Sequence, residues 1–161
     1  MKTIVIEDKQ RIESIILQAD ACFVGMVDLE GNPYVVPMNF GYENDILYLH
    51  SGPEGGKIEM LQRNNNVCIT FSLGHKLVYQ HKQVACSYSM RSESAMCRGK
   101  VEFIEDMEEK RRALDIIMRH YTKDQFGYSD PAVRNVKVWK VPVDQEKFSV
   151  CGQMKNHKKK W

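Results

Sequence analysis

The chain has 161 residues, of which 43% are hydrophobic and 27% are charged, and its formal net charge at pH 7 is +2. This length is typical of one domain whose core is large enough to fold without disulfide or metal support. The near balance of charges argues against nucleic acid as a partner, and no apolar run approaches the roughly 18 residues of a membrane span. Because there is also no signal-peptide pattern, we expect a cytoplasmic protein with no membrane contact.

The chain divides into one predicted domain, residues 1–152, and a basic C-terminal tail, residues 153–161. A tail of this kind is most often a solvated terminus. The five cysteines form an odd set without a C-x-x-C motif, which is typical of reduced thiols rather than of a disulfide framework.

The first predicted helix begins after Asp8, which is a good N-cap residue. Its apolar residues follow helical spacing as far as Ala19. Three predicted strands come next, at residues 22–27, 33–40 and 46–50, and they are joined by short turns. Pro37 marks the second of them as irregular or unpaired. We expect the three strands to form a meander.

Residues 51–57 are predicted to form a glycine-rich loop, and residues 58–64 a short helix with Ile58 and Leu61 facing inward. A strand is expected at residues 67–71. The polar stretch 73–84 is weakly patterned and is interpreted as a loop or loose hairpin.

A long strand is predicted at residues 94–104, in which Gly99 allows a bend or a close backbone approach. Asp106 begins a capping box for a helix that extends to Tyr121. Residues 136–141 alternate as a half-buried strand, and residues 147–150 indicate another. The predicted fold is therefore α+β, an antiparallel split β-barrel of about six strands with two or three flanking helices.

The loop at residues 51–57 combines features that bind a phosphate group. Ser51 offers a hydroxyl, His50 an imidazole and Lys57 an ammonium group, while Gly56 allows the backbone to come close at a helix N-terminus. The loop matches neither standard phosphate-loop motif, so the pattern by itself also fits an ordinary connection.

Several segments resemble, in order, those of a known family. They are residues 33–42, 47–51, Gly56 with Lys57, residues 63–64 and 67–68, residues 94–102 with Gly99, and the helix from Lys110 to Tyr121. The ordered set resembles the FMN-binding split-barrel superfamily related to pyridoxamine 5′-phosphate oxidase. Within it, the chain is most similar to the nitroimidazole-resistance (Nim-type) flavoproteins. The resemblance covers roughly residues 10–150.

The resemblance implies an FMN site and the residues that form it. The strand of Val36, Pro37, Met38 and Asn39 would lie along the flavin ring. His50, Ser51, Gly56 and Lys57 would hold the phosphate, and His50 is also the candidate catalytic residue, beside the flavin. Ser94, Ala95 and Met96 would come from the second subunit of a homodimer with the flavin at its interface.

The function implied is that of an FMN-dependent, nitroreductase-like oxidoreductase. NADH, NADPH or another donor would reduce the flavin, which would reduce a small molecule such as a nitro-aromatic compound or a quinone. A sensor or carrier that binds flavin or another ligand without turnover, and a haem-binding protein that uses His50, are the alternatives. Pyridoxamine phosphate oxidation itself is not expected, because the Arg-Leu-His stretch of those enzymes is replaced by Cys151 and the residues after it.

Other interpretations of the sequence are weaker. His75, His81, Cys86 and Cys97 match no standard zinc spacing, and no cysteine has a setting that would activate it. We therefore predict no metal site. The basic and aromatic residues at 137–140 are typical of a half-buried strand rather than of a nucleic-acid surface. Tyr88, Met90 and Arg91 fit either the substrate side of the flavin or an exposed loop.

Overall fold

The computed structural model describes residues 2–143 and 150–156 of the chain. Within these ranges it has ten strands, four α-helices and one short 3-10 helix. The strands are β1 (Lys2–Ile6), β2 (Cys22–Val27), β3 (Pro33–Met38), β4 (Gly41–Glu43), β5 (Ile46–Ser51), β6 (Asn66–Val78), β7 (Ser89–Lys100), β8 (Glu102–Ile104), β9 (Lys137–Pro142) and β10 (Val150–Asn156). The α-helices are α1 (Lys9–Gln18), α2 (Gly56–Arg63), α3 (Met107–Tyr121) and α4 (Asp130–Arg134), and η1 (Ala85–Ser87) is the 3-10 helix.

The strands form two antiparallel sheets, which confirms the predicted α+β class. One sheet has six strands in the order β1-β10-β7-β6-β2-β3, and the other has four in the order β4-β5-β9-β8. Both the strand number and the helix number exceed the prediction. The strand number is larger because the predicted strand 94–104 divides into β7 and β8, which belong to different sheets. In addition, β1 and β4 were not predicted.

The chain changes sheets between β3 and β4, so the predicted meander is wrong. β5 pairs with β4 and β9 rather than with β3. A second change occurs at Val101, which separates β7 from β8 and whose N–H donates to the Asn65 carbonyl. Gly99 lies just before it, where a Cβ atom would come within 2.6 Å of Val141 and 2.8 Å of the Pro142 carbonyl oxygen. The close approach expected at Gly99 is therefore confirmed.

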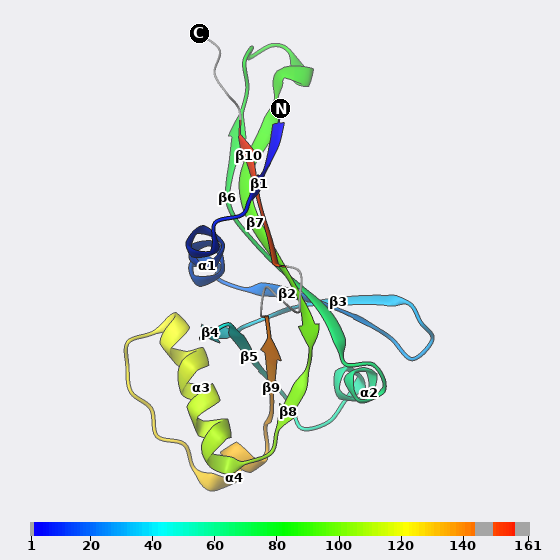
Figure 1. Ribbon diagram of the computed structural model, residues 1–161, viewed down its shortest axis with the longest axis vertical. Coiled ribbons are helices and arrows are strands. Elements are labelled where there is room, and N and C mark those ends of the chain that lie inside the picture. Colours follow the sequence, from blue (N-terminus) through cyan, green and yellow to red (C-terminus); the bar gives the residue numbers. More distant parts are fainter. Residues whose placement is uncertain (1, 144–149, 157–161) are drawn as a thin grey trace.

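The two long helices begin where their capping residues predict. The side chains of Asp8 and Asp106 accept hydrogen bonds from the backbone N–H groups of Arg11 and Glu109, respectively. Helix α1 packs on β6, β7 and β10, and α3 packs on β4, β5 and β9 (Figure 1). Ile58 and Leu61 of α2 are buried, as predicted.

A main hydrophobic core lies between the sheets and α1, and a smaller one lies under α3. Trp139, Phe40 and Phe71 are the largest fully buried side chains of the main core. None of the described helices combines the length and the apolar character that a membrane crossing requires.

Beyond Leu73 the β6–β7 hairpin extends away from the body of the molecule (Figure 1). We call residues 73–93 the arm. β6 continues to Val78 after a register shift between Leu73 and Lys76, so residues 73–78 form one side of a hairpin with β7. This agrees with the hairpin predicted as one alternative for 73–84, and not with the loop. Backbone pairing with β7 forms this strand, although its side chains lack a buried face.

β10 pairs with β1 on one side and with β7 on the other. Gln153–Asn156 therefore belong to a strand, whereas the prediction placed them in the tail. Their backbone groups find partners in two neighbouring strands, which a basic composition does not reveal. The predicted strand at 147–150 overlaps β10 only at Val150, and the rest of it lies outside the described residues, as do tail residues 157–161.

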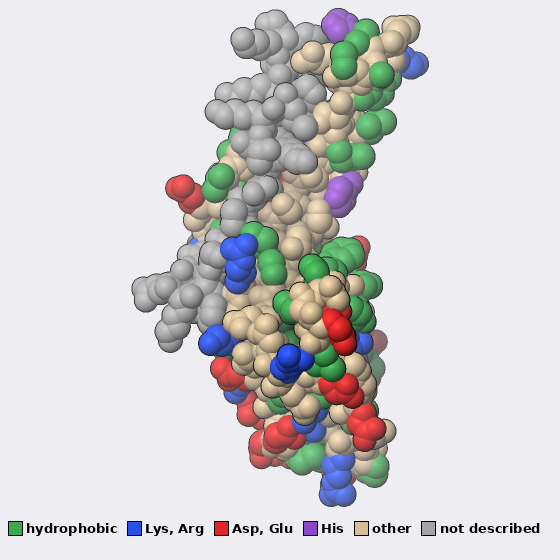
Figure 2. Space-filling model, turned by 90° about the vertical axis from the view of Figure 1, so that its right-hand side faces the viewer, with side chains coloured by type: hydrophobic (Ala, Val, Ile, Leu, Met, Phe, Trp, Pro, Cys, Tyr) green, Lys and Arg blue, Asp and Glu red, His purple; other side chains and the backbone are tan. Residues whose placement is uncertain are grey.

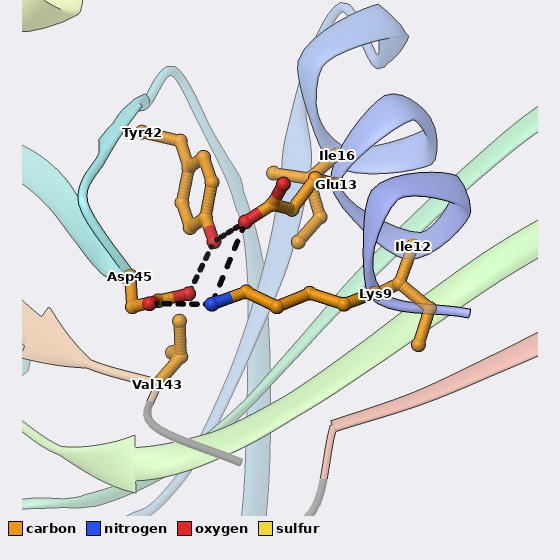
Figure 3. A pocket seen from close by; sticks show the side chains of 7 residues that line it. All are labelled: Lys9, Ile12, Glu13, Ile16, Tyr42, Asp45 and Val143. Carbon is orange, nitrogen blue, oxygen red and sulfur yellow. Dashed lines mark hydrogen bonds and ion pairs between the residues drawn. The ribbon is translucent and has the colours of Figure 1, made fainter. Parts of the chain in front are cut away.

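The turn between β4 and β5 is tied to α1 by a polar cluster (Figure 3). Asn44 and Asp45 have φ values of 52° and 60°, typical of a tight hairpin turn. The Tyr42 hydroxyl donates to Asp45 at 3.0 Å and lies 3.3 Å from Glu13, and Lys9 Nζ lies 2.7 Å from the other Asp45 oxygen. The cavity that these residues line, about 10 Å³, has room for one water molecule at most.

Candidate functional site

Among the described strands, β3 pairs on one side only, with β2. The Asp28 N–H donates to the Asn32 carbonyl where the hairpin begins. Because hydrogen-bonded pairs alternate along an antiparallel ladder, Tyr34, Val36 and Met38 bond to β2. The backbone groups of residues 33, 35 and 37 consequently face the open edge. Two of these residues are prolines, so the edge offers three carbonyl acceptors and the single N–H donor of Val35.

A hollow of about 190 Å³ lies between β3 and the start of α2. Its lining comprises Tyr34, Ser51, Gly52, Glu54, Gly55, Gly56, Lys57, Ile58 and Met60. Three of the four residues predicted to hold a phosphate, Ser51, Gly56 and Lys57, are therefore brought together. Tyr34 was not predicted as a site residue, although its place on β3, two residues before Val36, puts both side chains on the same face of the sheet.

The groups around this hollow fit a phosphate. No described side chain caps α2, and the Ile58 and Glu59 N–H groups donate to the Gly55 carbonyl, so the N–H groups of Gly56 and Lys57 remain available to an anion. A Cβ atom at Gly55 would meet no described atom within 4 Å, and one at Gly56 would meet only the end of Met60 at 3.7 Å. A ligand can thus approach the backbone closely. Lys57 supplies a positive charge, while the Glu54 carboxylate is the one lining group that opposes an anion.

His50 does not line the hollow. Successive side chains of a strand point to opposite faces, so the ring of His50 points away from the side chain of Ser51. It points toward the face of β5 that carries Tyr48, which packs against α3. The side chain is exposed in the single chain, yet desolvation by the surrounding protein lowers the pKa of His50 below its usual value. His50 is therefore neutral at pH 7.

The residues predicted along the flavin ring occupy both faces of β3. Val36 and Met38 are half-buried against the main core, whereas Pro37 is exposed on the opposite face. The exposed residue Asn39 lies just beyond the end of the strand, where the chain crosses to the second sheet.

Ser94, Ala95 and Met96 lie on β7, away from the hollow of the same chain. Ala95 is fully buried in the main core, so its side chain is not available to a ligand. Ser94 and Met96 point to the other side of the six-stranded sheet, together with Thr70, which pairs with Met96, and Phe23, which pairs with Thr70. We call this side the outer face.

Apolar side chains are exposed on the outer face. Phe23 is 47% exposed and Val35 is 62% exposed. Side chains alternate along β7, so Met90 lies on the same face as Ser94 and Met96, and the outer face extends onto the arm. There Met90 pairs with Leu77, and both side chains are exposed. At the end of the arm, the rings of Tyr79 and Tyr88 stack with their centroids 4.8 Å apart. Figure 2 shows hydrophobic side chains along the arm as well as over the body.

Among the described residues no group of three or more His, Cys, Asp or Glu side chains is placed to hold a metal, and Cys97 is buried in the core away from the arm. The thiols of Cys22, Cys68, Cys86 and Cys97 are free, and burial raises the pKa of those of Cys22 and Cys97 to about 12.

The aromatic and basic residues at 137–140 are engaged within the protein. Trp139 is fully buried, and its neighbours Lys137 and Lys140 form ion pairs with Glu105 and Glu109. The aromatic ring is thus unavailable for base stacking, and the two positive charges are already compensated.

The protein is thus an α+β protein built on two antiparallel sheets. An open strand edge beside a helix N-terminus without a side-chain cap gives it a candidate site for a ligand that carries a phosphate. Residues 8–147 match the family model described as pyridoxamine 5′-phosphate oxidase. The chain therefore belongs to this family, which has a flavin-binding fold. The chain matches no protein among those with curated descriptions.

Solved structures share this fold. A candidate 5-nitroimidazole antibiotic resistance protein from Bacteroides thetaiotaomicron is 88% identical, with a TM-score of 0.85 over 95% of this chain and 87% of that chain. A FAD- and haem-binding protein from Mycobacterium smegmatis is 16% identical, with a TM-score of 0.83 over 98% and 75% of the two chains. A FAD-binding protein from Mesorhizobium loti is 18% identical, with a TM-score of 0.67 over 97% and 100%. The last two show likeness of fold alone.

Proposed function

We propose that this protein binds FMN and acts as an oxidoreductase on small molecules, with nitro-aromatic compounds and quinones as the acceptor classes. The observation that carries the proposal is the hollow at the start of α2, which lies beside the open edge of β3. The 88% identity to a candidate nitroimidazole resistance protein supports the choice of acceptor. When bound, FMN supplies the electron chemistry that links NADH, NADPH or another donor to such an acceptor.

The residues of this chain then have separate tasks. Ser51, Lys57 and the backbone N–H groups of Gly56 and Lys57 would bind the phosphate, through charge-assisted hydrogen bonds and the helix dipole. The open edge of β3 would offer its carbonyls and the Val35 N–H to the polar edge of the ring. His50 points away from the hollow, which argues against a role at the phosphate; the role near substrate rests on the family resemblance.

The outer face supports the proposal of a homodimer. Ser94 and Met96 lie on this face, among exposed apolar side chains that have no cover in a single chain. Exposed apolar patches rimmed by polar residues are typical of protein interfaces. A second copy placed there would bury these side chains and bring Ser94 and Met96 toward the neighbouring flavin site.

The cofactor assignment is tested by reconstitution. Purified protein is expected to show a flavin absorption spectrum, and mass spectrometry of the released cofactor distinguishes FMN from FAD, while a Soret band would indicate haem. Lys57→Ala should weaken FMN binding by roughly 10- to 100-fold, as expected for the loss of a hydrogen bond to a charged group. Lys123→Ala is the matched control and should bind FMN like the wild type. Equal affinity in both variants would contradict the phosphate assignment.

Turnover is tested separately by anaerobic mixing with NADH or NADPH. Bleaching of the flavin, followed by recovery when a nitroimidazole or a quinone is added, is the result expected of an enzyme. A flavin that remains oxidised with both nicotinamides would instead indicate a carrier or sensor, or a different electron donor.

The dimer is tested by light scattering. Phe23→Glu places a charge on the outer face without disturbing the core and should yield monomers with reduced flavin content. Leu17→Glu, on the exposed side of α1, is the control because Leu17 is similarly exposed at 52%. A Phe23→Glu protein that remains dimeric would exclude this face as the interface.

A further inference from the structure

The chain crosses from β3 to β4 through Phe40, and one side chain from α3 holds its backbone. The Phe40 N–H donates to the Tyr121 hydroxyl at 3.1 Å, and the same hydroxyl donates to the Asp20 carbonyl at 3.1 Å. A phenol has one donor and can also accept, so a single group satisfies both backbone partners. Desolvation raises the pKa of Tyr121, which keeps the hydroxyl protonated.

The surroundings of Phe40 leave it little freedom. Its ring is fully buried, with centroid distances of 4.9 Å to Phe71 and 4.3 Å to His120. The His120 Nε2 atom lies 2.8 Å from the Ala19 carbonyl, which can only accept, so Nε2 carries the proton. A Cβ atom at the next residue, Gly41, would lie 2.7 Å from backbone atoms of α3.

This clamp determines the direction of the preceding carbonyl group. The described peptide bonds contain no cis bond, and a trans peptide is planar with its C=O and N–H groups pointing in opposite directions. Because the Phe40 N–H points to Tyr121, the Asn39 carbonyl points away from α3. Asn39 is exposed and follows the open-edge strand β3 directly.

We propose that Tyr121 is a positioning residue of the flavin site, which fixes the Asn39 carbonyl as an acceptor for the N–H group at the polar edge of the ring. The proposal rests on the proposed function, since it requires a flavin along β3. Tyr121 itself does not touch the ligand in this account. It acts through one peptide plane, which the protein holds before any ligand binds, and pre-orientation of this kind increases affinity.

Tyr121→Phe tests the proposal because it removes only the hydroxyl. Tyr42→Phe is the matched control: it removes a hydroxyl that bonds to Asp45 and Glu13 and so ties the β4–β5 turn to α1, rather than to the β3–β4 crossover. The measurements are the FMN dissociation constant by fluorescence, and the absorption spectrum and midpoint potential at saturating FMN. We expect Tyr121→Phe to raise the dissociation constant about tenfold and to shift the midpoint potential. Tyr42→Phe should leave all three values unchanged.

The outcomes separate this inference from the proposed function. The positioning role is overturned, and the FMN site left intact, if the Tyr121→Phe protein binds FMN with the affinity and midpoint potential of the wild type. Equal weakening by both variants also overturns it, because the loss would then follow from general destabilisation. A wild-type protein that binds no flavin overturns both. If Tyr121→Phe fails to fold, as judged by circular dichroism, Tyr121→His provides a second variant with a ring of smaller reach, and wild-type binding by it would contradict the proposal.

Discussion

Two strand ends flank the candidate site, and the protein holds them in opposite ways. At the end of β3, Phe40 and Gly41 are buried and are contacted by the backbone and side chains of α3. At the end of β5, the loop that follows Ser51 is exposed, and the Ser51 hydroxyl bonds only to the carbonyl of its neighbour Gly52 among described residues.

This difference shows that the two halves of a ligand site can differ in how far they are ordered before the ligand binds. The half that would receive a ring is fixed by packing before binding. The half that would receive a phosphate has few internal contacts, so the ligand itself would complete it. Mutations at the first end should therefore change stability as well as affinity, whereas mutations at the second should change affinity alone.

The largest effect is expected from Gly41→Ala. The added methyl group would lie 2.7 to 2.8 Å from backbone atoms of Ile116 and Ile117, so α3 must move. We expect a loss of about 3 kcal/mol in the free energy of unfolding, measured by urea denaturation. A loss below about 1 kcal/mol would show that the crossover is less tightly held than its contacts indicate.

Gly56→Ala is the corresponding change at the open end. Its methyl group would meet only Met60 at 3.7 Å, so the free protein should be as stable as the wild type or slightly more so. The methyl group would occupy the space that a phosphate needs near the helix N-terminus. Titration with FMN should show affinity at least about tenfold lower, and unchanged affinity would place the phosphate elsewhere.

The polar cluster at the β4–β5 turn makes a smaller, pH-dependent contribution to the stability of the region that follows β3. Hydrogen bonding from Lys9, and next from Tyr42, lowers the pKa of Asp45 below 3.8. The stability from this carboxylate is therefore present above pH 3.8 and is lost as the pH falls through the lower, folded-state pKa. Asp45→Asn should lose less than about 1 kcal/mol at pH 7 and show a weaker decline in acid. Urea denaturation at pH 2.5 to 7 measures both.

The smallest effect concerns His50, near the open end. Desolvation lowers its pKa from 6.5, so NMR should place its titration midpoint below that value. The folded protein binds the proton less readily than the unfolded chain. His50 consequently lowers the free energy of unfolding as the pH falls below 6.5. His50→Asn should remove this part of the pH dependence of stability. A midpoint above 6.5 would indicate an acidic partner, such as one supplied by a second copy.

The sequence predicted features whose cause is local. The capping side chains of Asp8 and Asp106 accept hydrogen bonds from the first turns of their own helices. The alternating side chains of residues 22–27 correspond to a strand with one buried face. The change of sheet after β3 was not predictable, because it depends on Phe40 meeting Tyr121, which lies 81 positions away. The extension of β6 into the arm depends on backbone pairing, which leaves no apolar alternation to detect.

For the candidate site, residue type and spacing identified Ser51, Gly56 and Lys57, which the fold brings to one hollow. The same spacing grouped His50 with them, but alternation at the strand end turns its ring to the other face. Tyr34 and Tyr121 were not identified as site residues, since their roles arise from packing between elements that are distant in the chain.

Pro33 and Pro37 on the open edge of β3 also have a consequence for solubility. A free strand edge is a template on which another chain can add a strand, and this is a common route to aggregation. With both prolines facing outward, the edge has lost two of its three N–H donors, so an incoming strand would find an incomplete ladder. The edge thus disfavours the addition of a strand while it keeps acceptors available for a small ring.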